Sequence, residues 1–129
     1  MASLFTKIIN GDIPAHKIAE DEKFLAFLDI SPLAKGHTLV IPKKEVNYFF
    51  DLDNDLLSGI NIFAKKVAAK IEKAIPCKRI GVAIIGLEVP HAHVHLIPLQ
   101  SVGDINFQRE KMNLSDEELA EIAEKIRTA

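Results

Sequence analysis

Three histidines occupy alternate positions in the segment His91-Ala92-His93-Val94-His95. Because side chains alternate between the two faces of a β-strand, this spacing predicts a strand that presents three imidazoles on one face. Ala92, Val94 and Leu96 are then expected on the opposite face, where they can be buried. Histidine changes charge near neutral pH and serves as nucleophile, acid, base or metal ligand. The row therefore indicates both a two-faced sheet and a functional site at its edge.

The remaining sequence predicts further short strands and two main helices. We expect a short helix over residues 3–10 and strands over residues 16–20, 23–29, 37–41, 79–85 and 92–98. The clearest helix covers residues 53–75, where apolar side chains recur on one face and Pro76 ends the pattern. The segment Ser115-Asp116-Glu117-Glu118 is a capping box that opens a final helix. Strands in series with few helices indicate an α+β fold, an antiparallel sheet of about five strands packed by helices on one face.

Length and composition limit the class of protein. The 129 residues predict a single domain over residues 1–129, and a net charge of −2 argues against a general nucleic-acid binder, which needs a basic face. The single cysteine, Cys77, excludes an intrachain disulfide. No apolar run approaches the ~18 residues of a membrane span, and the N-terminus lacks the pattern of a signal peptide. We therefore expect a cytoplasmic protein that binds neither nucleic acid nor membrane.

Residue chemistry allows three interpretations of the histidine row. The first interpretation, histidines that only pack at the surface, is disfavoured, because protonation of one ring would electrostatically oppose protonation of its neighbours. A zinc site is possible, but His91 and His95 would lie ~13 Å apart along a strand, so that His37 would be the better third ligand. The third interpretation is covalent catalysis on phosphorus. It is preferred because it uses all three histidines: His93 as nucleophile, His95 against the phosphate or leaving group, and His91 tuning His93.

The row also resembles the signature of a known family. Residues 91–97 are similar to the His-x-His-x-His-x-x signature of the histidine triad (HIT) superfamily of nucleotide hydrolases and transferases. Four N-terminal segments are similar, in order and spacing, to its histidine triad nucleotide-binding (Hint) branch: residues 4–9, 11–15, 26–32 and 36–43. The resemblance covers about residues 3–100 and leaves a C-terminal extension, residues 101–129. In this extension Arg109 and Lys111 are expected to be solvated rather than to reach a substrate tail.

The resemblance implies roles for individual residues. His93 is the nucleophile that carries a nucleotidyl-histidine intermediate, and Asp29 binds the ribose hydroxyls. His95, His91 and His37 contact the phosphate and fix the ring tautomers. A homodimer, with the sheet continued across the two-fold axis, is implied as well. The base is expected in an apolar pocket lined by Phe5, Ile8, Ile13, Phe27, Ile30 and Leu39.

Three departures from the family pattern affect this interpretation. Many bacterial relatives carry Cys-x-x-Cys near the N-terminus, which completes a structural zinc site with two histidines. Ser3 and Thr6 stand at those positions, so no such zinc is expected. Glu88 replaces a serine near the scissile phosphate, where a carboxylate would repel the phosphate. Glu88 is therefore expected either to be protonated and to donate its proton to the leaving group, or to point to solvent. An asparagine that usually precedes Gly86 is missing.

The function that follows is hydrolysis at the α-phosphate of purine nucleoside 5′-phosphate derivatives, of the phosphoramidate type. No metal or other cofactor is required by this mechanism. Glu88 is included among the residues expected to contact the substrate. One alternative is hydrolysis of dinucleoside polyphosphates, which differ in the leaving group. Another is a nucleotide-binding interaction protein with little catalysis.

Overall fold

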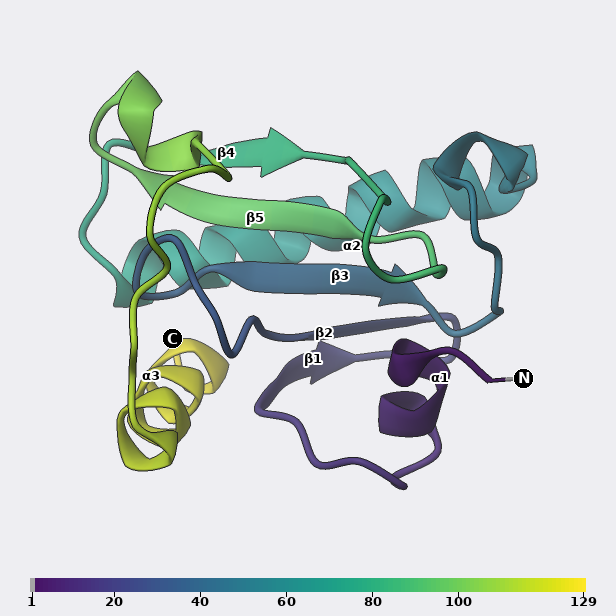
Figure 1. The fold of residues 1–129 in the computed structure, drawn as a ribbon, viewed down its shortest axis with the longest axis horizontal. Coiled ribbons are helices and arrows are strands. Elements are labelled where there is room, and N and C mark those ends of the chain that lie inside the picture. Colours follow the sequence, from purple (N-terminus) through teal and green to yellow (C-terminus); the bar gives the residue numbers. More distant parts are fainter. Residues whose placement is uncertain (1) are drawn as a thin grey trace.

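One five-stranded antiparallel sheet, in the order β1-β2-β3-β5-β4, organises the chain. The computed structural model describes residues 2–129. The strands are β1 (Lys17–Glu20), β2 (Phe24–Leu28), β3 (Thr38–Pro42), β4 (Arg79–Ala83) and β5 (Val94–Leu99). The helices are α1 (Leu4–Ile9), α2 (Asn54–Ala74) and α3 (Asp116–Arg127), with short 3-10 turns at Phe49–Asp51 and Val102–Ile105. Figure 1 shows the sheet with α2 behind it, and this arrangement confirms the predicted α+β fold.

Each helix begins after a polar residue whose side chain accepts a hydrogen bond from one of the free backbone amides of the first turn. Ser3 Oγ accepts a hydrogen bond from the amide of Thr6 at the start of α1, and Asp53 caps α2 in the same way. The predicted capping box at Ser115 is confirmed, because Ser115 and Glu118 each accept from the other's backbone amide. Within residues 2–129 no helix combines the length and the apolar character needed to cross a bilayer.

The two faces of the sheet pack different cores. All five residues of β2 are buried, because the strand alternates between two covered faces. Phe24, Ala26 and Leu28 pack with α2 and α3, whereas Leu25 and Phe27 pack with α1 on the other side. The expectation that the two main helices cover one face is therefore confirmed for α2 and α3, and the short helix α1 lies on the opposite face. This short helix covers only part of its face and leaves room for a pocket.

The histidine row lies only partly on a strand. Strand β5 begins at Val94, so that His91 and His93 precede it and the prediction of three histidines on one strand is wrong. The backbone leaves the sheet here because the amide of Ala92 donates to the carbonyl of Val46, outside the strands, over 2.7 Å. The alternation nevertheless holds. As predicted, Ala92, Val94 and Leu96 are buried in the core beneath α2.

Candidate active site

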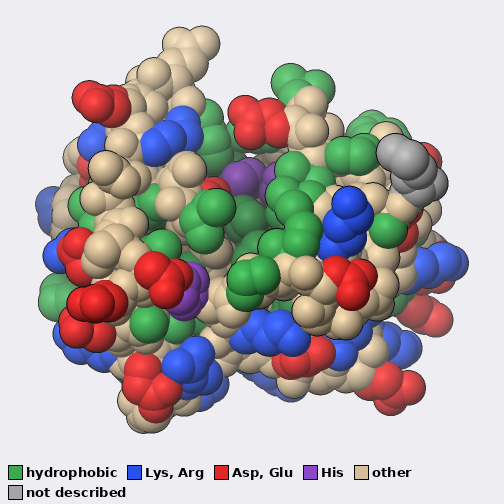
Figure 2. Space-filling view, turned by 60° about the horizontal axis from the view of Figure 1, so that its bottom comes forward, with side chains coloured by type: hydrophobic (Ala, Val, Ile, Leu, Met, Phe, Trp, Pro, Cys, Tyr) green, Lys and Arg blue, Asp and Glu red, His purple; other side chains and the backbone are tan. Residues whose placement is uncertain are grey.

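A pocket of about 380 Å³ opens on the sheet face that α1 only partly covers. Figure 2 shows histidine side chains at the bottom of a hollow bordered by hydrophobic side chains. His93 and His95 line this pocket together with Asp29 and Glu88. The apolar residues predicted for the base all line it too: Phe5, Ile8, Ile13, Phe27, Ile30 and Leu39. The structure thus brings nearly all of the predicted residues together, and their individual roles stay predictions.

His93 is held by one ring nitrogen and open at the other. Its Nδ1 lies 2.7 Å from the carbonyl oxygen of His91, and a carbonyl can only accept, so Nδ1 carries the proton. Phe5 packs edge-on against the ring at a centroid distance of 5.1 Å. With the ring proton on Nδ1, Nε2 is the nitrogen that can carry a lone pair, and within residues 2–129 it makes no hydrogen bond. This is the state that a nitrogen nucleophile requires.

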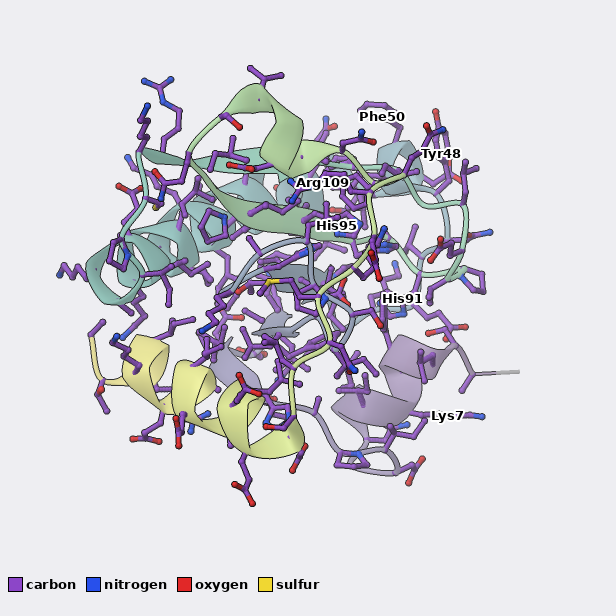
Figure 3. The ribbon with its side chains drawn as sticks, turned by 60° about the vertical axis from the view of Figure 1, so that its left-hand side comes forward. Lys7, Tyr48, Phe50, His91, His95 and Arg109 are labelled. Atoms are coloured by element: carbon purple, nitrogen blue, oxygen red, sulfur yellow. The ribbon has the colours of Figure 1, made fainter. Side chains whose placement is uncertain are left out.

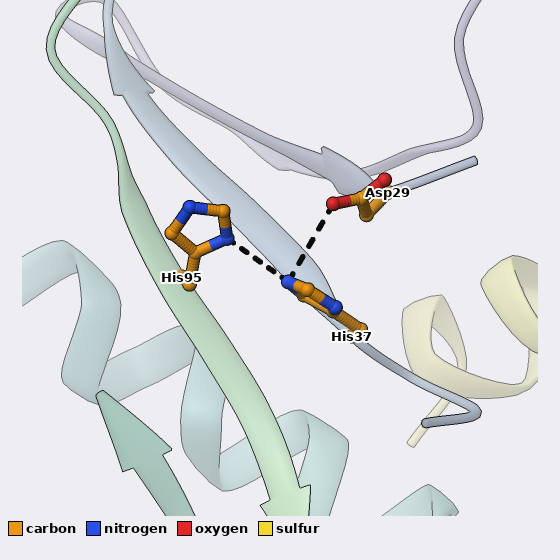
Figure 4. A group of neighbouring side chains, drawn as sticks. All are labelled: Asp29, His37 and His95. Carbon is orange, nitrogen blue, oxygen red and sulfur yellow. Dashed lines mark hydrogen bonds and ion pairs between the residues drawn. The ribbon is translucent and has the colours of Figure 1, made fainter. Parts of the chain in front are cut away.

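A second hydrogen-bonded chain fixes the tautomer of His95. The backbone amide of Leu33 donates to Nδ1 of His37 over 3.0 Å, which leaves the ring proton of His37 on Nε2. This Nε2–H donates to Nδ1 of His95 over 3.0 Å (Figure 4). The proton of His95 is consequently on its own Nε2, the nitrogen free to donate to a ligand. Burial lowers the pKa of His37 to about 3 and that of His95 to about 4, so both rings are neutral at pH 7.

Asp29 stands at the pocket end of the same chain. Its Oδ1 accepts from the amide of Ser31 over 2.8 Å, while Oδ2 lies 3.6 Å from Nε2 of His37. The side chain is 21% exposed, and its burial raises the pKa of the carboxyl above its ordinary value. The one proton on Nε2 of His37 goes to the shorter contact with His95. Oδ2 of Asp29 is thereby left free to accept from a ligand hydroxyl.

Asp29, His37 and His95 are close enough to suggest a metal site, since one donor atom of each lies within 4.8 Å of the others. The hydrogen bonds do not fit that use. A metal at Nε2 of His37 would require the proton on Nδ1, where it would meet the amide N–H of Leu33. The donor set of this cluster therefore suits a proton-ordered hydrogen-bond chain better than a cation.

His91 lies outside the pocket, beside α1 (Figure 3). Its Nε2 donates to the carbonyl oxygen of Pro42 over 2.8 Å, so Nδ1 accepts from the hydroxyl of Ser3, also over 2.8 Å. The hydroxyl of Thr6 lies 3.5 Å from the same nitrogen and donates to Glu45 over 2.6 Å. Burial lowers the pKa of His91, and the hydrogen bond from Thr6 lowers that of Glu45 to about 2. Ser3 and Thr6 thus anchor α1 to the turn before His93.

The sequence did not place the C-terminal extension at the pocket. Phe107 and Lys111, both from the C-terminal extension, line the pocket. Lys111 is exposed to solvent, as expected, and also lines the pocket, whereas Arg109 pairs with Asp104 over 3.2 Å and does not line it. No periodicity marks residues 106–112, and only the folded chain shows that this segment crosses the sheet face. Glu88 is exposed and lines the pocket, which is compatible both with a proton donor to the leaving group and with a side chain turned to solvent.

Comparisons with known proteins place these features in a family. Residues 10–102 match the family described as the HIT domain. An uncharacterised HIT-like protein of Borreliella burgdorferi is 38% identical over 137 aligned positions, which cover 95% of this chain and 94% of the relative. The adenosine 5′-monophosphoramidase hnt1 of Schizosaccharomyces pombe is 41% identical over 103 residues, 76% of this chain and 74% of that protein.

A solved structure agrees with the sequence relatives. The Hit-like protein of Bartonella henselae, crystallised with an unknown ligand, has a TM-score of 0.84 and 34% identity over 98% of this chain and 95% of its own. The family match over residues 10–102 includes all five strands, the histidine row and most of the residues that line the pocket. The chain therefore belongs to the HIT family of nucleotide-binding proteins and hydrolases.

Proposed function

We propose that this protein hydrolyses purine nucleoside 5′-phosphoramidates through a covalent nucleotidyl intermediate on His93. The observation that carries the proposal is the 2.7 Å hydrogen bond from Nδ1 of His93 to the carbonyl of His91, which leaves Nε2 free in the pocket. A neutral imidazole held in one tautomer is a competent nucleophile toward phosphorus. The name of the S. pombe relative, an adenosine 5′-monophosphoramidase, supports this choice of leaving group.

The first chemical step forms one bond and breaks another. Nε2 of His93 attacks the α-phosphorus, and the departing nitrogen leaves with the P–N electron pair and takes up a proton from solvent as the amine, a proton that the water of the second step later returns to solvent. The Nε2–H of His95 donates to a phosphoryl oxygen and stabilises the charge that builds up there. Water then attacks phosphorus, the bond to His93 breaks, and the nucleoside monophosphate leaves with neutral His93 restored.

Two parts of the pocket would hold the nucleoside. The free Oδ2 of Asp29 would accept hydrogen bonds from the ribose hydroxyls. The flat base would lie among the apolar side chains, where Phe5 and Phe27 pack edge to face at 5.5 Å. The large apolar wall favours a purine, which buries more area than a pyrimidine.

We propose further that the reaction requires no metal. The donors that could assemble an ion site, Asp29, His37 and His95, are ordered by the amide of Leu33 in the tautomer that opposes coordination. Transition-state charge would be stabilised by hydrogen bonds from neutral donors instead. A chelator such as EDTA should accordingly leave the turnover rate unchanged.

A homodimer is also proposed, through the open edge of the sheet. Within residues 2–129 the outer edge of β4 pairs with no other strand. Val82 on this strand and Ile62 on α2 are each 59% exposed, and the groove between α2 and β4 includes Val82. An open strand edge beside apolar side chains favours pairing with a second copy. Light scattering should then give twice the chain mass, and Val82→Glu should shift it toward the monomer.

The catalytic proposal is tested by rapid-quench intact-mass measurement during incubation with adenosine 5′-phosphoramidate. Wild type should show a transient adenylyl adduct and accumulate AMP, and His93→Ala should show neither. His16→Ala is the matched control, because His16 lies on the surface against Asp116 and outside the pocket. If the protein binds AMP but forms neither adduct nor product from the phosphoramidate, the hydrolase proposal is contradicted and a nucleotide-binding protein is favoured. Diadenosine polyphosphate in place of the phosphoramidate tests the other leaving group.

A further inference from the structure

The C-terminal extension contributes one wall of the pocket. Phe107 packs edge-on against His95 at a centroid distance of 4.7 Å and against His37 at 6.1 Å. The segment is held at its other end by the loop between β2 and β3, where the amide of Met112 donates to the carbonyl of Pro32 over 2.8 Å. Figure 1 shows the segment between β5 and α3 passing in front of the sheet. Residues 106–112 are thus held directly over the imidazoles that would face the phosphate.

Lys111 brings a positive charge to this wall. Among residues 2–129 it is the only lysine or arginine that lines the pocket. Its Nζ donates to the carbonyl of Phe107 over 2.6 Å and lies 5.8 Å from the centroid of the Phe107 ring. The ammonium is therefore held one aromatic ring away from His95. In the described part of the chain, the ammonium contacts only backbone carbonyl oxygens and a ring face. An anionic ligand can replace these contacts at little cost in free energy.

The charges around the pocket leave a phosphate short of positive partners. Asp29 and Glu88 line the pocket as acidic side chains, and His37 and His95 are neutral at pH 7 because burial lowers their pKa values. The Lys111 charge also acts at this end of the pocket: it opposes the rise that burial causes in the pKa of Asp29, and it adds to the lowering that burial causes in the pKa values of both histidines. A phosphoryl group bound at His93 would meet neutral hydrogen-bond donors and, among the side chains of residues 2–129 that line the pocket, a single lysine or arginine, Lys111. Two nearby carboxylates make that cation more important, because they disfavour an anion.

We propose that Lys111 binds the anionic phosphoryl group of the substrate and sets the preference of the pocket for nucleotides over nucleosides. This inference rests on the proposed nucleotide-hydrolase function and adds a residue to it. Lys111 would leave the carbonyl of Phe107 and pair with a non-bridging phosphate oxygen. The same contact strengthens as negative charge gathers on the oxygens during attack by His93. The extension would thereby determine which anionic groups the site accepts.

The test compares two ligands that differ only in the phosphate. The dissociation constants of AMP and adenosine are measured by calorimetry for wild type, Lys111→Met, Lys111→Arg and Lys125→Met. Lys111→Met should bind AMP roughly tenfold more weakly and adenosine as well as wild type does, since a hydrogen bond to a charged group is lost. Lys111→Arg should restore most of the AMP affinity. Lys125→Met removes the same charge from the exposed side of α3 and should change neither constant.

The possible results separate this inference from the function on which it rests. Unchanged AMP affinity in Lys111→Met would overturn the role of Lys111 while leaving the hydrolase proposal intact. Equal losses for AMP and adenosine would also overturn it, because they would show that Lys111 only supports the segment. Failure of the wild type to bind either ligand would refute the nucleotide function itself, and the role of Lys111 with it. AMP affinity that falls with added salt in wild type, but less in Lys111→Met, would support direct pairing.

Discussion

His37 and His95 share a 3.0 Å hydrogen bond between Nε2 of the first and Nδ1 of the second, although they are 58 positions apart in the chain. The pair forms because β3 and β5 are neighbours in the sheet, with Leu39 opposite His95. The amide of Leu33 sets the direction of the bond by donating to the other nitrogen of His37. A backbone amide thus determines that the ring proton of His95 is on Nε2, the nitrogen that faces the pocket.

Replacing His37 by asparagine should slow turnover without abolishing binding. The side-chain oxygen of asparagine can still accept from Leu33, but the donor that fixes the tautomer of His95 is lost. We expect kcat for adenosine 5′-phosphoramidate to fall by roughly tenfold to a hundredfold, the cost of a misoriented group at the reacting centre. Steady-state kinetics measure it, with His16→Asn as control. A kcat equal to that of wild type would show that the pair does not orient His95.

The same buried histidines should make the fold sensitive to acid. Their ordinary pKa is 6.5, whereas in the folded protein those of His37 and His95 are about 3 and about 4. Between these values the unfolded chain binds more protons than the folded one, so stability is complete above about pH 6.5 and is lost as pH falls. We expect a loss of several kcal/mol by pH 4 from this source, about 3 kcal/mol for each ring.

Thermal unfolding between pH 7 and pH 4 checks this expectation. The Tm of wild type should fall across the whole interval, and that of His37→Asn should fall less, because one of the two titrating rings is gone. Parallel Tm curves for the two proteins would place the acid sensitivity elsewhere in the molecule.

Asp29 should determine recognition of the sugar. Its Oδ1 is used by the amide of Ser31, and Oδ2 is left for ribose hydroxyls. In Asp29→Asn the single carbonyl oxygen would remain with Ser31, so the ribose contact would disappear. Wild type should prefer adenosine over 2′,3′-dideoxyadenosine by roughly tenfold or more, and Asp29→Asn should show almost no preference. The ratio of the two dissociation constants measures this, with the exposed Asp12→Asn as control; a ratio that survives in Asp29→Asn would exclude the contact.

The parts of the fold that could be predicted are those with a strong local pattern. The long apolar face of α2, the capping box at Ser115 and the strand pattern around β2 and β3 each depend on neighbours in the sequence. The histidine row identified the site, because three imidazoles at alternate positions have few structural uses. The resemblance to the HIT family then supplied the apolar pocket residues, which a pattern alone cannot distinguish from ordinary core.

The parts that could not be predicted depend on contacts between distant segments. That His91 would lie behind the pocket follows from its bonds to Ser3 and to Pro42, 88 and 49 positions away. That Lys111 would enter the pocket follows from the path of an irregular segment, whose direction is fixed by the packing of Phe107 on His95. Neither contact leaves a periodic signal, because a single side chain in a loop is placed by tertiary packing.

The contact between Ser3 and His91 gives the last prediction, which concerns stability. Ser3 is 6% exposed, and its hydroxyl both caps α1 and donates to Nδ1 of His91, which is fully buried. Ser3→Ala would leave that nitrogen without a donor and the amide of Thr6 without an acceptor. We expect the free energy of unfolding to fall by roughly 1–3 kcal/mol, the combined cost of a lost cap and an unsatisfied buried group.

Urea denaturation at pH 7 measures the Ser3→Ala effect against two controls. Ser3→Thr keeps a hydroxyl and should recover part of the loss, whereas Ser58→Ala changes an exposed position on α2 and should stay within about 0.5 kcal/mol of wild type. A Ser3→Ala protein as stable as wild type would mean that His91 does not depend on this donor. If the loss is found, the hydroxyl at position 3 anchors α1 to the turn that carries His93.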